Sequence, residues 1–263
     1  MFVFNSRFQI ANFRFRFVQL KAANLQSKLY TMNVVVTGAG KGIGKAIAEK
    51  FAAEGNNIFI CARNAKELSE TAKELETNYR CKVFYLPADL SRKKSAQDFG
   101  KWVLQQISEV DVLINNAGQF IPGSIYNEED ELLEKMININ LYAAYNLTRT
   151  LLPGMMQKKL GHIFNICSIA ALRAYANGGS YSISKFALMG FSKNLREELM
   201  PYNIKVTAVY PGAVYTSSWH ESGVPESRIM EAADIADIIF ATSQLSTQAC
   251  VEDIIIRPQL GDI

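Results

Sequence analysis

A phenol and an ammonium group are spaced so that they meet on one face of a helix. Tyr181 and Lys185 are four residues apart in the segment YSISK, and residues at that spacing are neighbours on a helical surface. A free phenol has a pKa of about 10, and a nearby lysine cation lowers it by favouring phenolate. The pair predicts a group that exchanges a proton near neutral pH, although such pairs also occur on many ordinary helix surfaces.

A serine hydroxyl precedes this pair in the sequence. Ser168 follows HIFNI at 162–166, a run expected to form a buried strand. At the carboxyl end of that strand, its hydroxyl could hydrogen-bond a carbonyl oxygen on which negative charge develops. Read alone, Ser168 is equally compatible with an ordinary turn. Together with Tyr181, Lys185 and the glycine-rich turn described next, it forms a far more specific combination.

The segment TGAGKGIG, at 37–44, is a glycine-rich turn between a β-branched run and a segment of helical period. Backbone N–H groups and the positive end of the following helix would face one point there, which is a cradle for pyrophosphate. The spacing is GxxxGxG at Gly38, Gly42 and Gly44, because Ile43 stands where the GxGxxG fingerprint has its third glycine. A tight turn without a ligand is the alternative. The strand before it and the helix after it favour a dinucleotide.

Two basic side chains stand where the ribose of that dinucleotide is expected. Chains that bind NAD have an acidic residue about 20 positions beyond the glycines, at the end of the second strand. This sequence has Ala62 and Arg63 there. Arg63 and Lys41 can hold a 2′-phosphate by charge-assisted hydrogen bonds. With no competing carboxylate the two predict NADP(H), and two solvated surface charges are the alternative.

The elements that position these residues alternate from residue 33 onward. Short β-branched runs and longer segments of helical period predict an α/β fold: one doubly wound, Rossmann-type parallel sheet of about seven strands with helices on both faces. The candidate residues then follow the carboxyl ends of the strands, where such sheets bind ligands. Expected strands are 33–37, 57–61, 82–86, 111–114, 162–166, 204–209 and 253–257, and expected helices are 42–54, 64–78, 128–157, 180–200 (capped by Ser180) and 234–243.

The composition argues against several other classes of protein. The chain has 263 residues and a net charge of only +3, so nothing global attracts nucleic acid or an anionic membrane. Its four cysteines are scattered and its two histidines are isolated, which predicts no metal site and a reducing, cytoplasmic environment. It lacks a run of 18 apolar residues that would span a membrane.

Residues 1–31 are expected to lie outside the folded domain, which is expected to cover 32–263. They hold five basic residues and no acidic one, and Arg14 and Arg16 interrupt the apolar run that a secretory signal needs. This composition would suit an organelle transit peptide. Met32, however, directly precedes the first strand, so a dispensable extension or a misplaced start codon is favoured.

Across residues 33–258 the sequence resembles the short-chain dehydrogenase/reductase family. The resemblance implies a tetrad of Ser168, Tyr181, Lys185 and Asn140, in which Asn140 holds a water on a proton relay and Lys185 also bonds the nicotinamide ribose. Without the resemblance, helix capping or polar filling would be preferred for Asn140. The motifs that carry it are TGAGKGIG (37–44), Asp89 in PADL, NNAG (115–118), Asn140 in ININL, Ser168 in ICSIAA, YSISK (181–185) and PG (211–212).

The resemblance also implies a set of residues that bind NADP(H). In that set Asp89 contacts the adenine, and Asn116 with Gly118 shapes the nicotinamide end. The set comprises Gly38, Gly40, Lys41, Gly42, Ile43, Gly44, Arg63, Asp89, Asn116, Ala117, Gly118, Tyr181, Lys185, Pro211 and Gly212.

The activity implied is NADPH-dependent reduction of a small-molecule carbonyl by a homodimer or homotetramer that pairs through helices 128–157 and 180–200. The C-terminal stretches PGAVYTSSW and EDIIIRPQLGDI are similar to bacterial sepiapterin reductases and lack the glycine pattern that ends 3-oxoacyl-carrier-protein reductases. A compact ketone or diketone is therefore expected. Tyr175, Tyr215 and Trp219 are its candidate contacts, although Trp219 could instead only anchor a loop.

Three alternatives remain open from the sequence. Two are enzymes with the same residues, a 3-oxoacyl-carrier-protein reductase and an NADP-dependent secondary-alcohol dehydrogenase. The third is a protein that senses NADP(H) without turnover, and such a protein could dispense with the tetrad.

Overall fold

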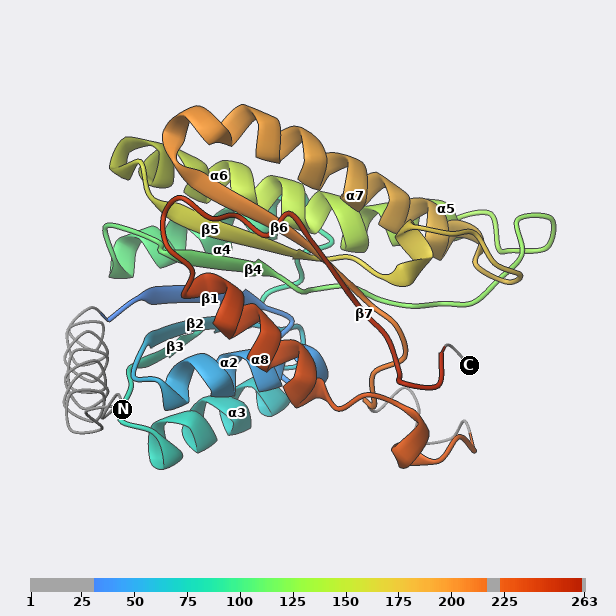
Figure 1. The fold of residues 1–263 in the computed structure, drawn as a ribbon, viewed down its shortest axis with the longest axis horizontal. Coiled ribbons are helices and arrows are strands. Elements are labelled where there is room, and N and C mark those ends of the chain that lie inside the picture. The colour runs from blue at the N-terminus through green and yellow to red at the C-terminus, as the bar shows by residue number, and fades with distance from the viewer. Residues whose placement is uncertain (1–30, 217–222, 262–263) are drawn as a thin grey trace, which may run out of the picture. The chain divides into compact units, whose positions relative to one another are not determined.

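A parallel sheet forms the centre of the domain. The computed structural model describes residues 31–216 and 223–261, and Met32–Ile263 forms one unit. Within it, seven strands lie in the order β3-β2-β1-β4-β5-β6-β7, and each is parallel to its neighbours (Figure 1). The strands are β1 (Asn33–Thr37), β2 (Asn57–Cys61), β3 (Val83–Tyr85), β4 (Val112–Asn115), β5 (Gly161–Ile166), β6 (Ile204–Pro211) and β7 (Asp253–Ile256).

Helices cover both faces of the sheet (Figure 1). Because side chains alternate along a strand, Val34 and Val36 of β1 pack in the core under α2 and α8, whereas Val35 packs in the core under α4 and α6. Because both faces of the sheet are covered, the three central residues of β1 are all apolar. The helices are α2 (Gly42–Ala53), α3 (Ala65–Asn78), α4 (Lys93–Gln106), α5 (Leu132–Ile137), α6 (Ala143–Lys158), α7 (Gly179–Leu199) and α8 (Ala232–Ser243).

The predicted doubly wound sheet is confirmed, but two local expectations about helices are wrong and one helix was missed. The helix expected at 128–157 begins at Leu132, and a π-helical turn at Asn138–Tyr142 separates α5 from α6. Ser180 lies inside the first turn of α7 and does not cap it, because Gly178 is the capping residue. Helix α4 was not predicted, although its buried side shows the helical spacing of Ala96, Phe99, Gly100 and Val103.

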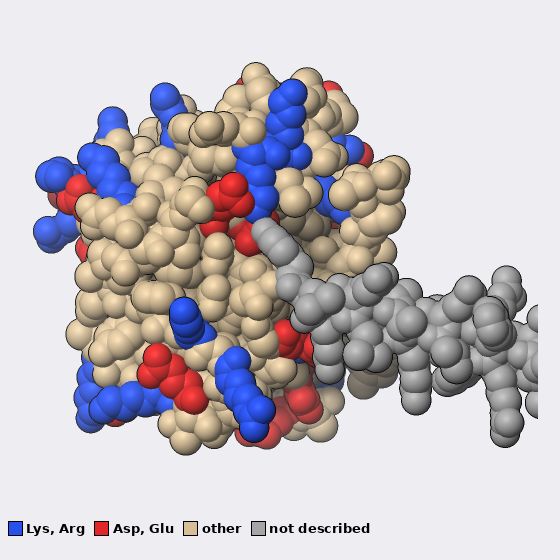
Figure 2. All heavy atoms as spheres, turned by 90° about the vertical axis from the view of Figure 1, so that its left-hand side faces the viewer, with Lys and Arg blue, Asp and Glu red and all other residues tan. Residues whose placement is uncertain are grey.

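The surface at the amino ends of the strands carries both signs of charge. Basic and acidic side chains are interspersed among uncharged residues over the described part of this face (Figure 2).

Within the described residues, none of the helices combines the length and apolar character needed to cross a bilayer. Those residues also contain no cluster of three or more histidine, cysteine or acidic side chains that could hold a metal ion.

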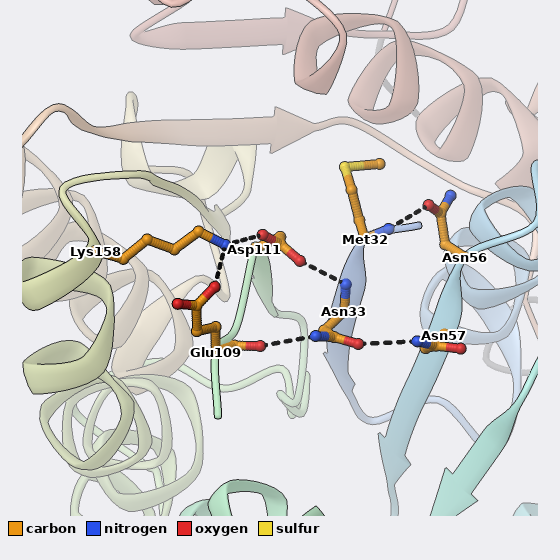
Figure 3. A network of polar contacts seen from close by, with 7 residues as sticks. All are labelled: Met32, Asn33, Asn56, Asn57, Glu109, Asp111 and Lys158. Carbon is orange, nitrogen blue, oxygen red and sulfur yellow. Dashed lines mark hydrogen bonds and ion pairs between the residues drawn. The ribbon is translucent and has the colours of Figure 1, made fainter. Parts of the chain in front are cut away.

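A polar network joins the amino ends of β1, β2 and β4, at the opposite end of the sheet from the candidate site (Figure 3). The Asn33 N–H donates to Asp111 at 2.7 Å, and its side chain links Asn57 on β2 to the carbonyl of Glu109. Lys158 at the end of α6 pairs with Asp111 at 2.7 Å and with Glu109 at 2.8 Å. Asp111 is only 6% exposed, and a buried carboxylate is costly unless it is paired and hydrogen-bonded.

Replacing Lys158 with methionine is expected to destabilise the domain by about 3 kcal/mol, because it removes an ion pair made at 2.7 Å to the buried Asp111 carboxylate. Urea unfolding of both proteins would measure the difference. Lys94→Met is the matched control, since Lys94 forms an exposed pair with Asp98 and its loss should cost less than about 1 kcal/mol. Equal effects of the two substitutions would contradict this role of Lys158.

Candidate active site

The glycine-rich turn is built by close backbone approach at the end of β1. Gly38 and Gly42 have φ of +67° and +59°, a left-handed conformation that favours glycine. A Cβ on Gly44 would lie 2.4 Å from the Gly38 carbonyl oxygen and 2.5 Å from Nδ2 of Asn116, so no side chain fits there. Helix α2 begins at Gly42, and Lys41, its capping residue, places no side chain on the first N–H groups. These donors and the helix dipole can therefore bind an anion.

Thr37 and Asn116 hold this turn against the end of β4. The Thr37 hydroxyl accepts the N–H of Asn116 at 3.0 Å and that of Ala117 at 2.9 Å. The Asn116 side chain donates to the carbonyls of Thr37 and Gly38 at 2.9 and 3.2 Å. The Asn116 amide nitrogen is thus engaged by the turn, and the role of Asn116 beside the nicotinamide stays a prediction.

The expectation that no carboxylate competes for the two basic residues is wrong. The first turn of α3 brings Glu67 beside the glycine turn, with its Oε1 3.7 Å from Nζ of Lys41. Both side chains are well exposed, so the attraction is screened and weak. Arg63 is exposed at the end of β2, as predicted. Asp89 lies after β3, where it accepts the N–H and hydroxyl of Ser91 at 3.2 and 2.7 Å.

The structure brings Ser168, Tyr181 and Lys185 together. Tyr181 and Lys185 lie on consecutive turns of α7, with Nζ 5.8 Å from the centroid of the phenol ring. Ser168 follows β5, accepts the Ala170 N–H at 3.1 Å and lies near enough to the Tyr181 phenol to lower its pKa. Lys185 is 5% exposed, and its ammonium donates to the carbonyl of Ile166 at 2.9 Å. The three groups therefore share a site at the carboxyl end of β5.

Burial shifts the pKa of both groups on α7 toward their uncharged forms. Burial raises the pKa of Tyr181 to about 12, against a smaller lowering by the hydrogen bond with Ser168. Burial also lowers the pKa of Lys185 to about 8. The expectation that Lys185 brings the phenol pKa below its ordinary value is therefore wrong for the protein's own groups, because desolvation of the phenolate outweighs the distant ammonium.

Asn140 lies in the π-helical turn between α5 and α6 and is 1% exposed. Its side chain pairs with the backbone of Gln119, accepting the N–H at 2.8 Å and donating to the carbonyl at 3.0 Å, and it also donates to Ser184 at 2.9 Å. A Cβ on Gly118 would lie 2.9 Å from Oδ1 of Asn140 and 3.5 Å from Nζ of Lys185. Asn140 is thus next to the tyrosine–lysine pair and fixes the chain after β4. It does not cap a helix.

The structure describes two of the three residues predicted to contact a substrate, Tyr175 and Tyr215. Tyr175 is 44% exposed and lies near enough to Tyr181 to influence its pKa. Tyr215 follows β6, where its phenol hydrogen-bonds Glu226 and its N–H donates to Met230. Trp219 lies outside the described residues. Pro211 ends β6, and the N–H of Gly212 donates to Ile256 at 2.8 Å.

Sequence reasoning missed several residues that surround the site. The Phe120 ring packs edge-on against Tyr181 with centroids 4.8 Å apart, and Glu128 accepts the N–H of Ser180 at 2.8 Å. The role of Thr37 in holding the turn could have been predicted, because its hydroxyl stands directly before the first glycine of the motif. Phe120, Glu67 and Glu128 come from loops or helix starts that only the fold brings to the site, and no spacing indicated them.

Comparisons with known proteins agree on one family. The family model described as short chain dehydrogenase matches residues 32–226. An uncharacterized oxidoreductase of Staphylococcus epidermidis is 31% identical over 225 residues, which cover 85% of this chain and 96% of the relative. An uncharacterized oxidoreductase of Staphylococcus aureus is 30% identical over 224 residues, with 85% and 96% coverage.

Solved structures with the same fold include complexes with NADP or NADPH. A metagenomic short-chain oxidoreductase in complex with NADP has a TM-score of 0.77 and 30% identity, covering 88% of this chain and 99% of that one. L-Sorbose reductase from Gluconobacter frateurii, complexed with NADPH and L-sorbose, has a TM-score of 0.81 and 28% identity, covering 87% and 95%. A variant of actinorhodin polyketide ketoreductase with NADPH has a TM-score of 0.80 and 27% identity, covering 89% and 98%.

Gly44→Ala is expected to destabilise the domain by about 2 kcal/mol and to abolish anion binding at the turn, because its Cβ would displace the Gly38 carbonyl or Asn116. Thermal unfolding would measure the first effect and titration with pyrophosphate or a dinucleotide the second. Gly154→Ala on α6 is the control, since the nearest atom to its Cβ would be the Ser108 carbonyl at an ordinary 3.8 Å. A Gly44→Ala protein as stable as the Gly154→Ala protein would contradict the close approach.

Proposed function

The chain belongs to the short-chain dehydrogenase family, and from that premise we propose that this NADP-dependent oxidoreductase reduces a small carbonyl compound with NADPH. One observation carries the proposal: Ser168, Tyr181 and Lys185 meet at the carboxyl end of β5. The glycine turn follows the carboxyl end of β1, on the same side of the parallel sheet. A phenol, a hydroxyl and an ammonium group suffice for acid catalysis on a carbonyl oxygen.

The residues at the end of β1 and β2 fit NADPH. Gly38 and Gly44 approach closely, and no side chain caps the first N–H groups of α2, so these donors can bind a pyrophosphate. Lys41 and Arg63 supply positive charge for the 2′-phosphate, and the pairing of Lys41 with Glu67 is weak enough to be given up. When bound, NADPH supplies the hydride. We assign the adenine side to Asp89 and the nicotinamide end to Asn116 with Gly118, where Asn116 also supports the glycine turn.

The proton is assigned to Tyr181. In this mechanism the hydroxyl of Ser168 holds the carbonyl oxygen, and Tyr181 donates its phenolic proton as negative charge develops there. The raised pKa keeps Tyr181 protonated at neutral pH, which suits an acid in the reductive direction. Lys185 returns the proton to Tyr181, and Asn140, beside Gly118 and Lys185, holds the water that connects this relay to solvent.

We infer a compact ketone or diketone as substrate, as in the sepiapterin reductases that the C-terminal sequence resembles. Phe120 beside Tyr181 and the half-exposed Tyr175 support a flat or apolar group next to the carbonyl. Tyr215 and Trp219 remain candidate contacts from the segment after β6. Reduction of a 3-oxoacyl thioester and oxidation of a secondary alcohol are the alternatives with the same residues, and an NADP(H)-sensing protein is the alternative without turnover.

The exposed apolar residues of α5, the π-helical turn after it, α6 and α7 support a homodimer or homotetramer. The ring centroids of Tyr145 on α6 and Phe191 on α7 lie 5.6 Å apart, and this contact joins the two helices. Burying these residues against a second copy would remove apolar area from water. The exposed apolar residues are Leu133, Tyr142, Tyr145, Ile183 and Phe186.

We also propose a cytoplasmic location, because the four cysteines are unpaired, as in a reducing compartment.

The reaction is tested by following NADPH oxidation at the nicotinamide absorbance with sepiapterin, a simple 1,2-diketone and an acetoacetyl thioester, and with NADH as the control cofactor. We expect turnover with NADPH and a preference for sepiapterin or the diketone. Preference for the thioester would replace the substrate assignment, and no turnover with any of the three would favour the sensor.

Tyr181→Phe is expected to lower kcat by about a hundredfold or more, because it removes the donated proton. The dissociation constant of NADPH should stay unchanged, since the phenol hydroxyl is not part of the phosphate cradle. Stopped-flow kinetics and NADPH fluorescence titration measure the two quantities. Tyr85→Phe on β3 is the control and should change neither. Full turnover in Tyr181→Phe would remove the tyrosine from the mechanism.

The pH dependence of kcat is expected to follow Lys185. Its pKa in the folded protein is lowered to about 8, so the ammonium is present below that pH and is lost as the pH rises through it. Because the relay needs the ammonium, kcat for reduction should be flat below about pH 8 and fall above it. The NADPH dissociation constant, measured over the same range, separates binding from the proton step. A kcat that stays constant to about pH 10 would argue against this role of Lys185.

A further inference from the structure

The segment between β4 and α5, residues 119–131, is attached to the start of α7 by several contacts. The N–H of Gly123 donates to the Asn177 carbonyl at 3.1 Å, and the Ser124 hydroxyl donates to Oδ1 of Asn177 at 2.8 Å. Glu128 adds the strongest link, because its carboxylate accepts both the N–H and the hydroxyl of Ser180. These contacts join two segments that lie about fifty residues apart in the sequence.

Two glycines make room for the Glu128 carboxylate. A Cβ on Gly179, whose φ is +35°, would lie 1.8 Å from Oε1 of Glu128, and a Cβ on Gly123 would lie 2.7 Å from its Cγ. The half-buried side chain of Glu128 therefore lies against both backbones, and neither glycine position has space for a Cβ atom. Such a fit fixes the distance between residues 119–131 and α7.

The carboxylate occupies the position of a helix cap. Helix α7 begins at Gly179 after Gly178, which has no side chain to cap the first N–H groups. Glu128 supplies the missing acceptor from another segment, and its negative charge lies at the positive end of the helix dipole. Ser180, its partner, is 2% exposed and directly precedes Tyr181. The first turn of α7, which carries Tyr181, is thus held from outside the helix.

The same segment reaches Tyr181 a second time. Gln119, at its start, is fixed by the Asn140 side chain, and the following Phe120 packs its ring against the phenol at 4.8 Å. Residues 119–131 therefore touch Tyr181 directly at one end and hold its helix turn at the other. A shift of this segment would move the phenol relative to Ser168.

We propose that Glu128 is a positioning residue: it fixes the first turn of α7, and with it the Tyr181 phenol, at the distance that proton donation to the carbonyl oxygen requires. This inference rests on the proposed role of Tyr181. A displacement of the order of 1 Å is enough to reduce turnover by orders of magnitude, so the effect of losing Glu128 falls on kcat. NADPH binding, which uses the glycine turn at the end of β1, is left intact.

The test compares Glu128→Ala with Glu128→Gln and with Glu129→Ala, which removes an exposed carboxylate from the adjacent position. In Glu128→Ala, kcat for carbonyl reduction should fall by about tenfold or more, with an unchanged NADPH dissociation constant. Glu128→Gln should restore most of the lost kcat, because its amide oxygen still accepts the Ser180 N–H. Glu129→Ala should match the unmodified protein. If Glu128→Ala does not fold, Ser180→Ala, which removes one of the two donors, should show a smaller loss confined to kcat.

Hydrogen exchange provides a readout that does not depend on turnover. Amides of the first turn of α7, residues 179–183, should exchange faster in Glu128→Ala than in Glu129→Ala, while those of β5 stay protected. Unchanged exchange, an unchanged kcat, or a parallel loss of kcat and NADPH affinity would each overturn the proposal. If the unmodified protein reduces none of the carbonyls, the proposed function fails, and the exchange rates alone decide whether Glu128 fixes this turn.

Discussion

The site depends on the close approach between the end of β1 and the end of β4. Thr37 provides one hydroxyl that accepts two N–H groups from the chain after β4, and this fixes the separation of the two strand ends. The separation in turn leaves no room for a Cβ at Gly44. The glycine pattern is thus a consequence of hydrogen bonding between strands as well as a requirement of the ligand, because an anion cradle needs backbone N–H groups that no side chain covers.

Hydrogen bonds between buried polar side chains connect the end of β4 to β5 and to α7. The Asn115 amide at the end of β4 donates to Asn165 on β5 at 2.8 Å, and Asn165 donates to Ser192 on α7 at 2.8 Å. Asn115 also donates to Thr148 on α6. Buried amides are costly unless they are paired, so these bonds select one placement of α6 and α7 on the sheet. Glu128 acts on the other end of α7, and the helix that carries Tyr181 and Lys185 is fixed at both places.

Burial also sets the electrostatics of the site. It raises the pKa of the Tyr181 phenol and lowers that of the Lys185 ammonium, which in each case favours the neutral form. The same cause appears at His162, which is stacked on Phe164 and hydrogen-bonded to Thr207, and whose pKa burial lowers to about 3. His162 is thereby a neutral core residue, whereas Tyr181 and Lys185 lie beside Ser168 at the carboxyl end of β5. In the proposed function, the location of Tyr181 and Lys185, and not their burial alone, distinguishes them from a structural residue such as His162.

The amino-acid sequence is enough to predict the alternation of strands and helices except for α4, the glycine turn and the tyrosine–lysine pair. These features are local: strand and helix periods, a turn that needs left-handed φ, and a four-residue helical spacing. The sequence did not indicate the π-helical turn at Asn138–Tyr142, the Glu67 carboxylate beside Lys41, or Glu128 at the start of α7. Each of these depends on segments that are distant in the chain and meet only when the sheet and its helices pack. Tertiary structure also decided the direction of the Tyr181 pKa shift, because desolvation depends on everything that surrounds the phenol, whereas the spacing of Tyr181 and Lys185 describes only one neighbour.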